Sequence, residues 1–214
     1  MLPEGTSAFK LILADTAPAV LEGWRNQFLK WPEVEVRAAD VLETAADAML
    51  LPGNSFGFLD GGLALRVLEH GGWELEEELR QQIRSDHHGE LLVGQAIVLR
   101  RKSLPWAIVY APIWRTPRHL KDTVNVFLAA RAAFIAVKAA AEPIRSPSRS
   151  PIRSIVLPAM GVDPGGLDPR VSARQIRYAY EMETARRAAG DKNLSQIQRR
   201  ERKLQSIPET DKAD

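Results

Sequence analysis

Two segments of this 214-residue chain share one design, in which an apolar strand runs into a glycine-rich loop and then into a helix. The first spans residues 47–62 and ends in Asp60-Gly-Gly62, and the second spans residues 155–168 and contains Gly161 and the pair Gly165-Gly166. Glycine permits sharp bends and lets a ligand approach the main chain closely. The helix that follows each loop offers unpaired N–H groups, which suit an anion such as phosphate. Two such loops therefore predict one anion held from two sides.

Strands and helices are expected to alternate along most of the chain. Short apolar or alternating runs predict strands at residues 9–14, 34–38, 48–51, 96–99, 106–110 and 152–157. Helical periodicity follows Pro18 and recurs at residues 63–68, 73–83, 123–141 and 169–182. Such alternation favours an α/β fold with a mainly parallel sheet that helices cover on both faces.

Composition narrows the class of protein. With 45% hydrophobic and 26% charged residues, the chain can bury the core of one domain, which we place at residues 1–185. A net charge of +2 gives no strong field for a membrane or a nucleic acid, and no run reaches the roughly 18 apolar residues of a membrane span. The absence of cysteine excludes disulfides and thiol catalysis, and neither metal-ligand spacing nor a cofactor motif occurs. We therefore expect a cytoplasmic protein without a cofactor or a metal.

Two polar stretches lie outside the alternating order. Residues 143–151 are rich in Pro, Ser and Arg, which indicates a mobile surface connection. Residues 186–214 form a charged tail that we expect to be partly helical or disordered, without the apolar periodicity needed to pack on the domain. The basic cluster at residues 199–203 leaves a nucleic-acid arm as an alternative, although neighbouring acidic residues offset its charge.

The two loops and the aspartate that precedes them resemble the macrodomain family of ADP-ribose-recognising modules. The pattern is a strand ending in Asp40, a strand followed by Pro-x-Asn54 and a glycine loop, and later a strand followed by Pro-x-x-Gly161. The similarity covers about residues 34–180, and the strand and helix before it resemble a bacterial or phage-associated branch. The resemblance implies a three-layer αβα sandwich around a mixed, mostly parallel sheet. It also implies an ADP-ribose cleft at the carboxyl ends of the strands, where open α/β sheets bind ligands.

The resemblance assigns roles to two side chains at strand ends. Asp40, which precedes Val41, stands where the family places the carboxylate that accepts a hydrogen bond from the adenine amino group. Its alternative role is to cap a short helix. Asn54 matches the asparagine that bonds the distal ribose, and its alternative role is that of a turn residue beside Gly53.

Both loops depart from the family pattern. The second loop carries a carboxylate at Asp163, which would repel a diphosphate if it pointed inward, so we expect it to face solvent or to bond the loop backbone. An aromatic side chain is missing there, and Phe56 or Phe58 of the first loop is its candidate replacement or else an apolar staple. The predicted ligand contacts are Asp40, Val41, Asn54, Phe56, Gly61, Gly62, Gly161, Val162, Asp163, Gly165 and Gly166.

The position that bears on catalysis is Ala64. Family hydrolases place an aspartate there to activate water, and alanine cannot accept a proton. Asn54 and Asp60 are the remaining catalytic candidates, although Asp60 is more ordinarily a helix cap. We therefore expect a module that binds free or conjugated ADP-ribose. The alternatives are an ADP-ribosyl hydrolase acting on a modified protein or nucleic acid through a non-standard base, and an interaction protein that kept the fold without the ligand.

Overall fold

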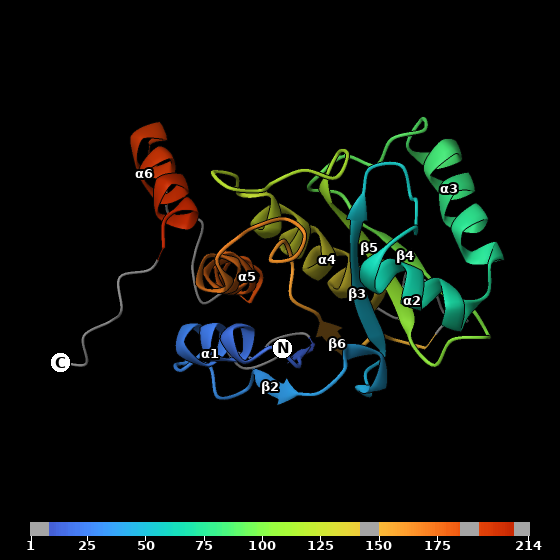
Figure 1. Ribbon diagram of the computed structural model, residues 1–214, viewed down its shortest axis with the longest axis horizontal. Coiled ribbons are helices and arrows are strands. Elements are labelled where there is room, and N and C mark those ends of the chain that lie inside the picture. Colours follow the sequence, from blue (N-terminus) through green and yellow to red (C-terminus); the bar gives the residue numbers. More distant parts are fainter. Residues whose placement is uncertain (1–8, 142–149, 185–192, 208–214) are drawn as a thin grey trace.

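The computed structural model describes residues 9–141, 150–184 and 193–207 (Figure 1). Six described strands form one sheet in the order β2-β1-β6-β3-β5-β4. All neighbouring strands are parallel except β4, which runs antiparallel to β5. The strands are β1 (Lys10–Asp15), β2 (Glu35–Ala38), β3 (Ala48–Asn54), β4 (Ile97–Leu99), β5 (Ala107–Trp114) and β6 (Ser154–Leu157).

Alternating side chains on the central strands divide the core into two layers. On β1, Leu11 and Leu13 enter one buried cluster, whereas Ile12 enters the other. The first cluster lies under α1 (Pro18–Gln27), α4 (Asn125–Ala141) and α5 (Pro169–Glu183), and the second lies under α2 (Gly62–Gly71) and α3 (Glu74–Asp86). Because strands covered on both faces bury every side chain, β5 is buried along its whole length.

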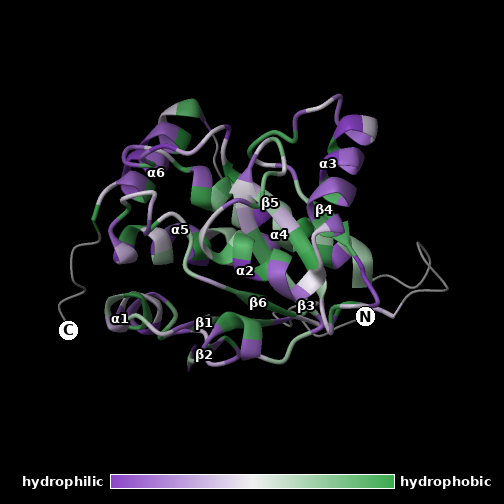
Figure 2. Cartoon of the chain, turned by 45° about the vertical axis from the view of Figure 1, so that its right-hand side comes forward, coloured by the Kyte–Doolittle hydropathy of each residue, from purple (hydrophilic) through white to green (hydrophobic). Residues whose placement is uncertain are grey.

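This arrangement confirms the expected three-layer αβα sandwich with a mixed, mostly parallel sheet. Figure 2 shows hydrophobic residues concentrated in the central strands and α4, whereas α3 carries many hydrophilic residues. Among residues 9–141, 150–184 and 193–207, no helix combines the length and the apolar character that a membrane crossing requires.

The tail contributes one further helix, α6 (Leu194–Gln205), which lies beside α5 at the edge of the molecule in Figure 1. Leu204 is buried, and its carbonyl accepts a hydrogen bond of 3.2 Å from the Gln175 amide on α5. Leu194 and Ile197, nearer the start of α6, remain exposed. The sequence predicted a helical part of the tail but not this contact, because one buried leucine makes no periodic pattern.

Two expectations fall on parts of the chain that the structure does not describe. The proposed mobile connection at 143–151 lies almost wholly outside the described residues, and so does the domain boundary near residue 185. The division of the chain into residues 1–185 and 186–214 therefore stays a prediction.

Candidate functional site

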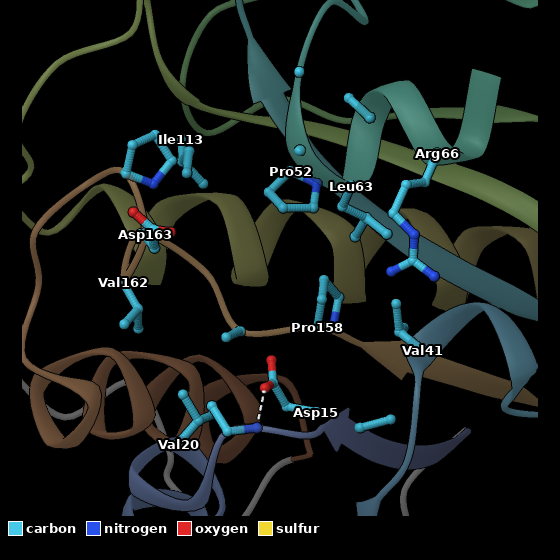
Figure 3. Close-up of a pocket in the computed structure, with 18 of the residues that line it drawn as sticks. Asp15, Val20, Val41, Pro52, Leu63, Arg66, Ile113, Pro158, Val162 and Asp163 are labelled. Atoms are coloured by element: carbon cyan, nitrogen blue, oxygen red, sulfur yellow. Dashed lines mark hydrogen bonds between the residues drawn. The ribbon is translucent and has the colours of Figure 1, made fainter. Parts of the chain in front are cut away.

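A cavity of about 490 Å³ lies at the carboxyl ends of the parallel strands (Figure 3). Residues at or just beyond the ends of β1, β2, β3, β5 and β6 contribute to its wall, together with the start of α2. The strand order therefore places Asp40, after β2, at one end of the cavity, whereas Asn54 and Trp114, on β3 and β5, lie towards the other. This is the edge of the sheet where the sequence predicted the ligand.

Asp40 lines the cavity and also caps a short helix, so both of its expected roles are compatible with the structure. Its Oδ1 accepts the backbone N–H of Leu42 at 3.0 Å, at the start of the 3₁₀ helix η1 (Val41–Glu43). Its Oδ2 accepts a hydrogen bond from the Arg66 guanidinium, which reaches over from α2. The guanidinium beside Asp40 holds the pKa of that carboxyl below its usual range. The carboxylate is therefore ionised and held from two directions, and Val41 lines the cavity next to it.

The first strand brings a second carboxylate to the cavity. Asp15 ends β1, and its Oδ1 accepts the backbone N–H of Ala17 at 2.8 Å, marked by the dashed line in Figure 3. Ala17 is the N-cap of α1, so this bond holds the residue before Pro18 and does not cap an amide inside the helix. Figure 3 shows the Asp15 carboxylate directed towards the cavity, across from Pro158.

Asn54 lies in the cavity wall, and its side chain organises the first loop. Its Oδ1 accepts the backbone N–H groups of Phe56 at 3.0 Å and Phe58 at 3.3 Å, and its Nδ2 donates to the Phe58 carbonyl at 2.9 Å. The Asn54 carbonyl accepts a hydrogen bond of 2.7 Å from the buried Tyr110 hydroxyl. Tyr110 also explains Gly53, because a Cβ at Gly53 would lie 2.2 Å from that hydroxyl oxygen. Asn54 therefore acts as the expected turn residue, and one amide hydrogen remains for a ligand.

The paired glycines of the first loop open onto free space. Gly61 is the N-cap of α2 without a side-chain cap bond, which shows that the expected capping role of Asp60 is wrong. The N-cap falls one residue later than the sequence suggested, and Asp60 is exposed in the cavity wall. A Cβ at Gly61 or Gly62 would meet no atom within 4 Å, and Gly62 has a positive φ of 55°. Ala64 also lines the cavity, as the resemblance implied.

Only the first part of the second glycine loop lines the cavity. Gly161, Val162 and Asp163 line the cavity, and Asp163 is exposed. Gly165 and Gly166 do not line it. A Cβ at Gly165 would lie 2.5 Å from the Gly161 carbonyl oxygen, and one at Gly166 would lie 2.8 Å from Nδ1 of His119. These two glycines therefore permit close packing behind the loop, where the sequence had placed ligand contacts.

The aromatic residues near the cavity also differ from the expectation. Phe58 lines the cavity and is 41% exposed, with the Arg80 guanidinium 4.2 Å from its ring centroid. Phe56, the predicted contact, lies outside the lining and pairs with the Arg115 guanidinium at 5.0 Å. Arg115 in turn forms an ion pair with Glu90 at 2.7 Å. Of the two candidate phenylalanines, Phe58 is therefore the one available to a ligand, and Trp114 is a further aromatic residue of the lining.

Charge distinguishes this cavity from a simple anion site. Asp15, Asp40, Asp60 and Asp163 all line it, whereas Arg66 is the one cation among the described lining residues. Arg66 and Asp40 neutralise each other, which leaves the remaining carboxylates to repel an anion. Within the described ranges, no group of three or more His, Cys, Asp or Glu side chains is arranged to hold a metal ion.

Two cavity residues escaped the sequence interpretation. Arg66 lies on a helix face where an isolated arginine normally faces solvent, and its partner Asp40 is distant in sequence. No binding role was predicted for Asp15, which follows the predicted strand at residues 9–14. The order of the strands, in which β1 lies between β2 and β6, would have placed Asp15 beside Asp40.

Searches with the sequence find relatives of this chain but no matching family model. An uncharacterized protein of Aeropyrum pernix is 30% identical over 145 residues, which cover 67% of this chain and 68% of that protein. An uncharacterized protein of Aquifex aeolicus is 25% identical over 145 residues, or 67% of this chain and 78% of that protein.

Solved structures are similar in fold. The macrodomain of Thermus aquaticus DarG has a TM-score of 0.53 and 22% identity, covering 67% of this chain and 87% of that chain. The macrodomain of Mycobacterium tuberculosis DarG has a TM-score of 0.51 and 21% identity, covering 68% and 88%. A variant of the Oceanobacillus iheyensis macrodomain has a TM-score of 0.53 and 19% identity, covering 68% and 77%. Two further structures of the Oceanobacillus iheyensis protein, each with a TM-score of 0.52, contain ADPR (ADP-ribose) or ADP.

Proposed function

The chain has the macrodomain fold and belongs to one family with the uncharacterized protein of Aeropyrum pernix, and on this basis we propose that it binds ADP-ribose, free or attached to a macromolecule. The observation that carries the proposal is a cavity that is lined both by Asp40 and by residues of the two glycine loops. Its volume of about 490 Å³ lies in the range of small-molecule sites.

The end of the cavity at Asp40 suits adenine. An ionised carboxylate accepts hydrogen bonds and donates none, and the exocyclic amino group of adenine is a donor. Val41, the residue after Asp40, lines the same end and offers apolar surface to the purine ring. A purine with a 6-amino group is therefore the base that this end fits.

The other end suits a diphosphate and a ribose. The first N–H groups of α2 have no partner within the helix, and they open beside Gly61 and Gly62, where no side chain covers them. Asn54 has one amide hydrogen left for a hydroxyl, and Phe58 offers a ring face. These groups can hold the ligand although Asp60 and Asp163 oppose its negative charge.

Calorimetric titration of the full chain with ADP-ribose tests the proposal. We expect one-to-one binding in the micromolar range, or about 7–8 kcal/mol, and weaker binding of AMP and of ribose 5-phosphate, each of which fills only part of the cavity. Glu69→Gln, at an exposed position of α2 outside the lining, is the matched control and should bind like the native protein. No heat and no thermal shift at ~1 mM ADP-ribose would refute the proposal and favour an interaction protein that lacks the ligand.

A hydrolase is the second candidate, and one observation favours it. Asp60 lines the cavity beside Gly61 and is free of the capping role that would have occupied it. A carboxylate there reaches a substrate from a different direction than one at Ala64. Release of ADP-ribose from modified protein or nucleic acid by the native protein, lost in Asp60→Asn, would support hydrolysis. Binding without turnover would support recognition alone, which is the function that we favour.

A location in the cytoplasm remains a prediction from the sequence. That the bound ADP-ribose is attached to a macromolecule is likewise part of the proposal. The overall charge of +2 offers no general attraction for nucleic acid.

A further inference from the structure

We propose that Arg66 is the positioning residue for base recognition: by holding Asp40, it makes the cavity select adenine over hypoxanthine. The inference rests on the proposed function, because it concerns the base of the bound ADP-ribose. At position 6 adenine has an amino donor and hypoxanthine has a carbonyl acceptor, and at N1 adenine has an acceptor and hypoxanthine an N–H donor. A site that presents only an acceptor to position 6 distinguishes the two.

The contacts of Asp40 show how Arg66 sets this acceptor. The Leu42 N–H binds Oδ1 at 3.0 Å, and the Arg66 guanidinium binds Oδ2. Each oxygen of a carboxylate has two lone-pair directions, so one direction on each oxygen remains available. Because the two donors hold different oxygens, the plane of the carboxylate is fixed. Without Arg66, Asp40 keeps one backbone bond and can turn about it.

The positive charge of Arg66 also favours the acceptor role of Asp40. It lowers the pKa of Asp40, which keeps the carboxyl ionised when a base covers it and removes it from water. A protonated carboxyl would be a donor as well as an acceptor and would tolerate the carbonyl of hypoxanthine. Arg66 therefore maintains both the orientation and the acceptor character of Asp40.

The position of Arg66 makes it suitable for substitution. Its side chain is 49% exposed, compared with 27% for Asp40, and it extends from α2 to the wall of the cavity above Val41 (Figure 3). A surface position of this kind tolerates a polar replacement with little effect on folding. The matched control is Arg84, whose side chain is 51% exposed and pairs with Glu77 on α3, outside the cavity lining.

The experiment compares two ligands, ADP-ribose and its analogue with hypoxanthine in place of adenine. The native protein should prefer ADP-ribose by about tenfold or more, because a charged acceptor facing a carbonyl oxygen is left unpaired. Arg66→Gln should reduce this preference by at least about threefold, whereas Arg66→Lys, which keeps the charge, should retain most of it. Arg84→Gln should keep the native preference.

A double-mutant cycle shows whether Arg66 acts through Asp40. In an Asp40→Asn background, the amide can donate to the carbonyl, so the preference should be small and Arg66→Gln should leave it unchanged. If Arg66→Gln still changes the preference in that background, Arg66 contacts the base itself and the positioning role is wrong.

Three results separate the failure of this inference from that of the proposed function. Native binding of ADP-ribose with an unchanged preference in Arg66→Gln overturns the inference and leaves the proposed function intact. A native protein that binds ADP-ribose and its analogue equally also overturns the inference alone. A native protein that binds neither overturns both. Melting temperatures show that each variant is folded, and Arg66→Ala, which also removes the charge, carries the comparison if Arg66→Gln does not fold.

Discussion

Replacing Gly61 by leucine tests whether the first glycine loop holds the ligand. Gly61 has an extended backbone, with φ −164°, which any residue adopts, and a Cβ there meets no atom within 4 Å. The new side chain therefore extends from the cavity wall into open space without strain in the main chain. It should cover the free amides at the start of α2, which the diphosphate is proposed to approach.

The magnitude follows from the bonds that the ligand would lose. A hydrogen bond to a charged group contributes about 1.5–3 kcal/mol, so the loss of one phosphate contact weakens binding by roughly 10- to 150-fold. The cost in stability should be smaller. Leucine is a poorer N-cap than glycine, but Gly61 contributes no side-chain cap bond, so the free energy of unfolding should fall by less than ~1 kcal/mol.

Calorimetry and thermal unfolding together check this prediction. Gly61→Ser is the matched control, because serine adds one small group and is a preferred N-cap, so it should keep most of the affinity and unfold slightly later. Gly165→Leu provides the contrast, since its Cβ would lie 2.5 Å from the Gly161 carbonyl oxygen and should lower the melting temperature first. Unchanged affinity in a folded Gly61→Leu protein would refute the idea that the diphosphate lies at the start of α2.

Three other predictions concern catalysis, charge and the tail. Ala64→Asp should raise the rate of ADP-ribose release, because a positioned general base contributes about 10²–10⁴-fold; robust turnover by the native protein, measured on the same modified substrate, would contradict this. Asp163→Asn should tighten ADP-ribose binding a few-fold, and the gain should shrink with added salt; an unchanged affinity at low ionic strength would show that this carboxylate faces away from the ligand. Leu204→Ser should lower the melting temperature without changing ADP-ribose affinity, because Leu204 is buried against the domain and is absent from the cavity lining; an unchanged melting temperature would show that α6 adds no stability.

The fold was predictable because the apolar strands, the amphipathic helices and their alternation all indicate the same arrangement. Residues 11–14 of β1 and 48–51 of β3 are all apolar, as strands covered on both faces require, and amphipathic helices follow. The bounds were less accurate. From the sequence we expected the fifth strand to end at Tyr110, because a proline such as Pro112 is rare inside a central strand. In the structure β5 continues through Pro112 to Trp114. Its register with β3 beyond that proline depends on pairing between distant segments.

The lining of the cavity was predictable only in part from the sequence. Asp40 follows β2, Asn54 ends β3, and Gly61 precedes the first residue of α2. The topology therefore brings all three to the same edge of the sheet. Gly165 follows the same rule and still lies behind the wall, because the sequence does not show which side of a loop a glycine faces. Arg66 was missed because its contact with Asp40 depends on how α2 packs on the sheet, which the sequence does not show.

Asn54 combines an observed structural role in the first loop with the binding role that we propose for it. The Oδ1 of Asn54 accepts hydrogen bonds from the backbone amides of Phe56 and Phe58, so Asn54 stabilises the loop conformation in the absence of a ligand. The same bonds place Phe58 in the cavity wall, and Tyr110 fixes the Asn54 carbonyl from below. A loop held in this way has little entropy left to lose when a ribose binds, which favours affinity. Because a single asparagine supplies the loop geometry and retains one amide hydrogen for the ligand, a loss of binding in Asn54→Ala would report on both functions together. Gly61→Leu separates them, since it changes the wall and leaves the bonds of Asn54 in place.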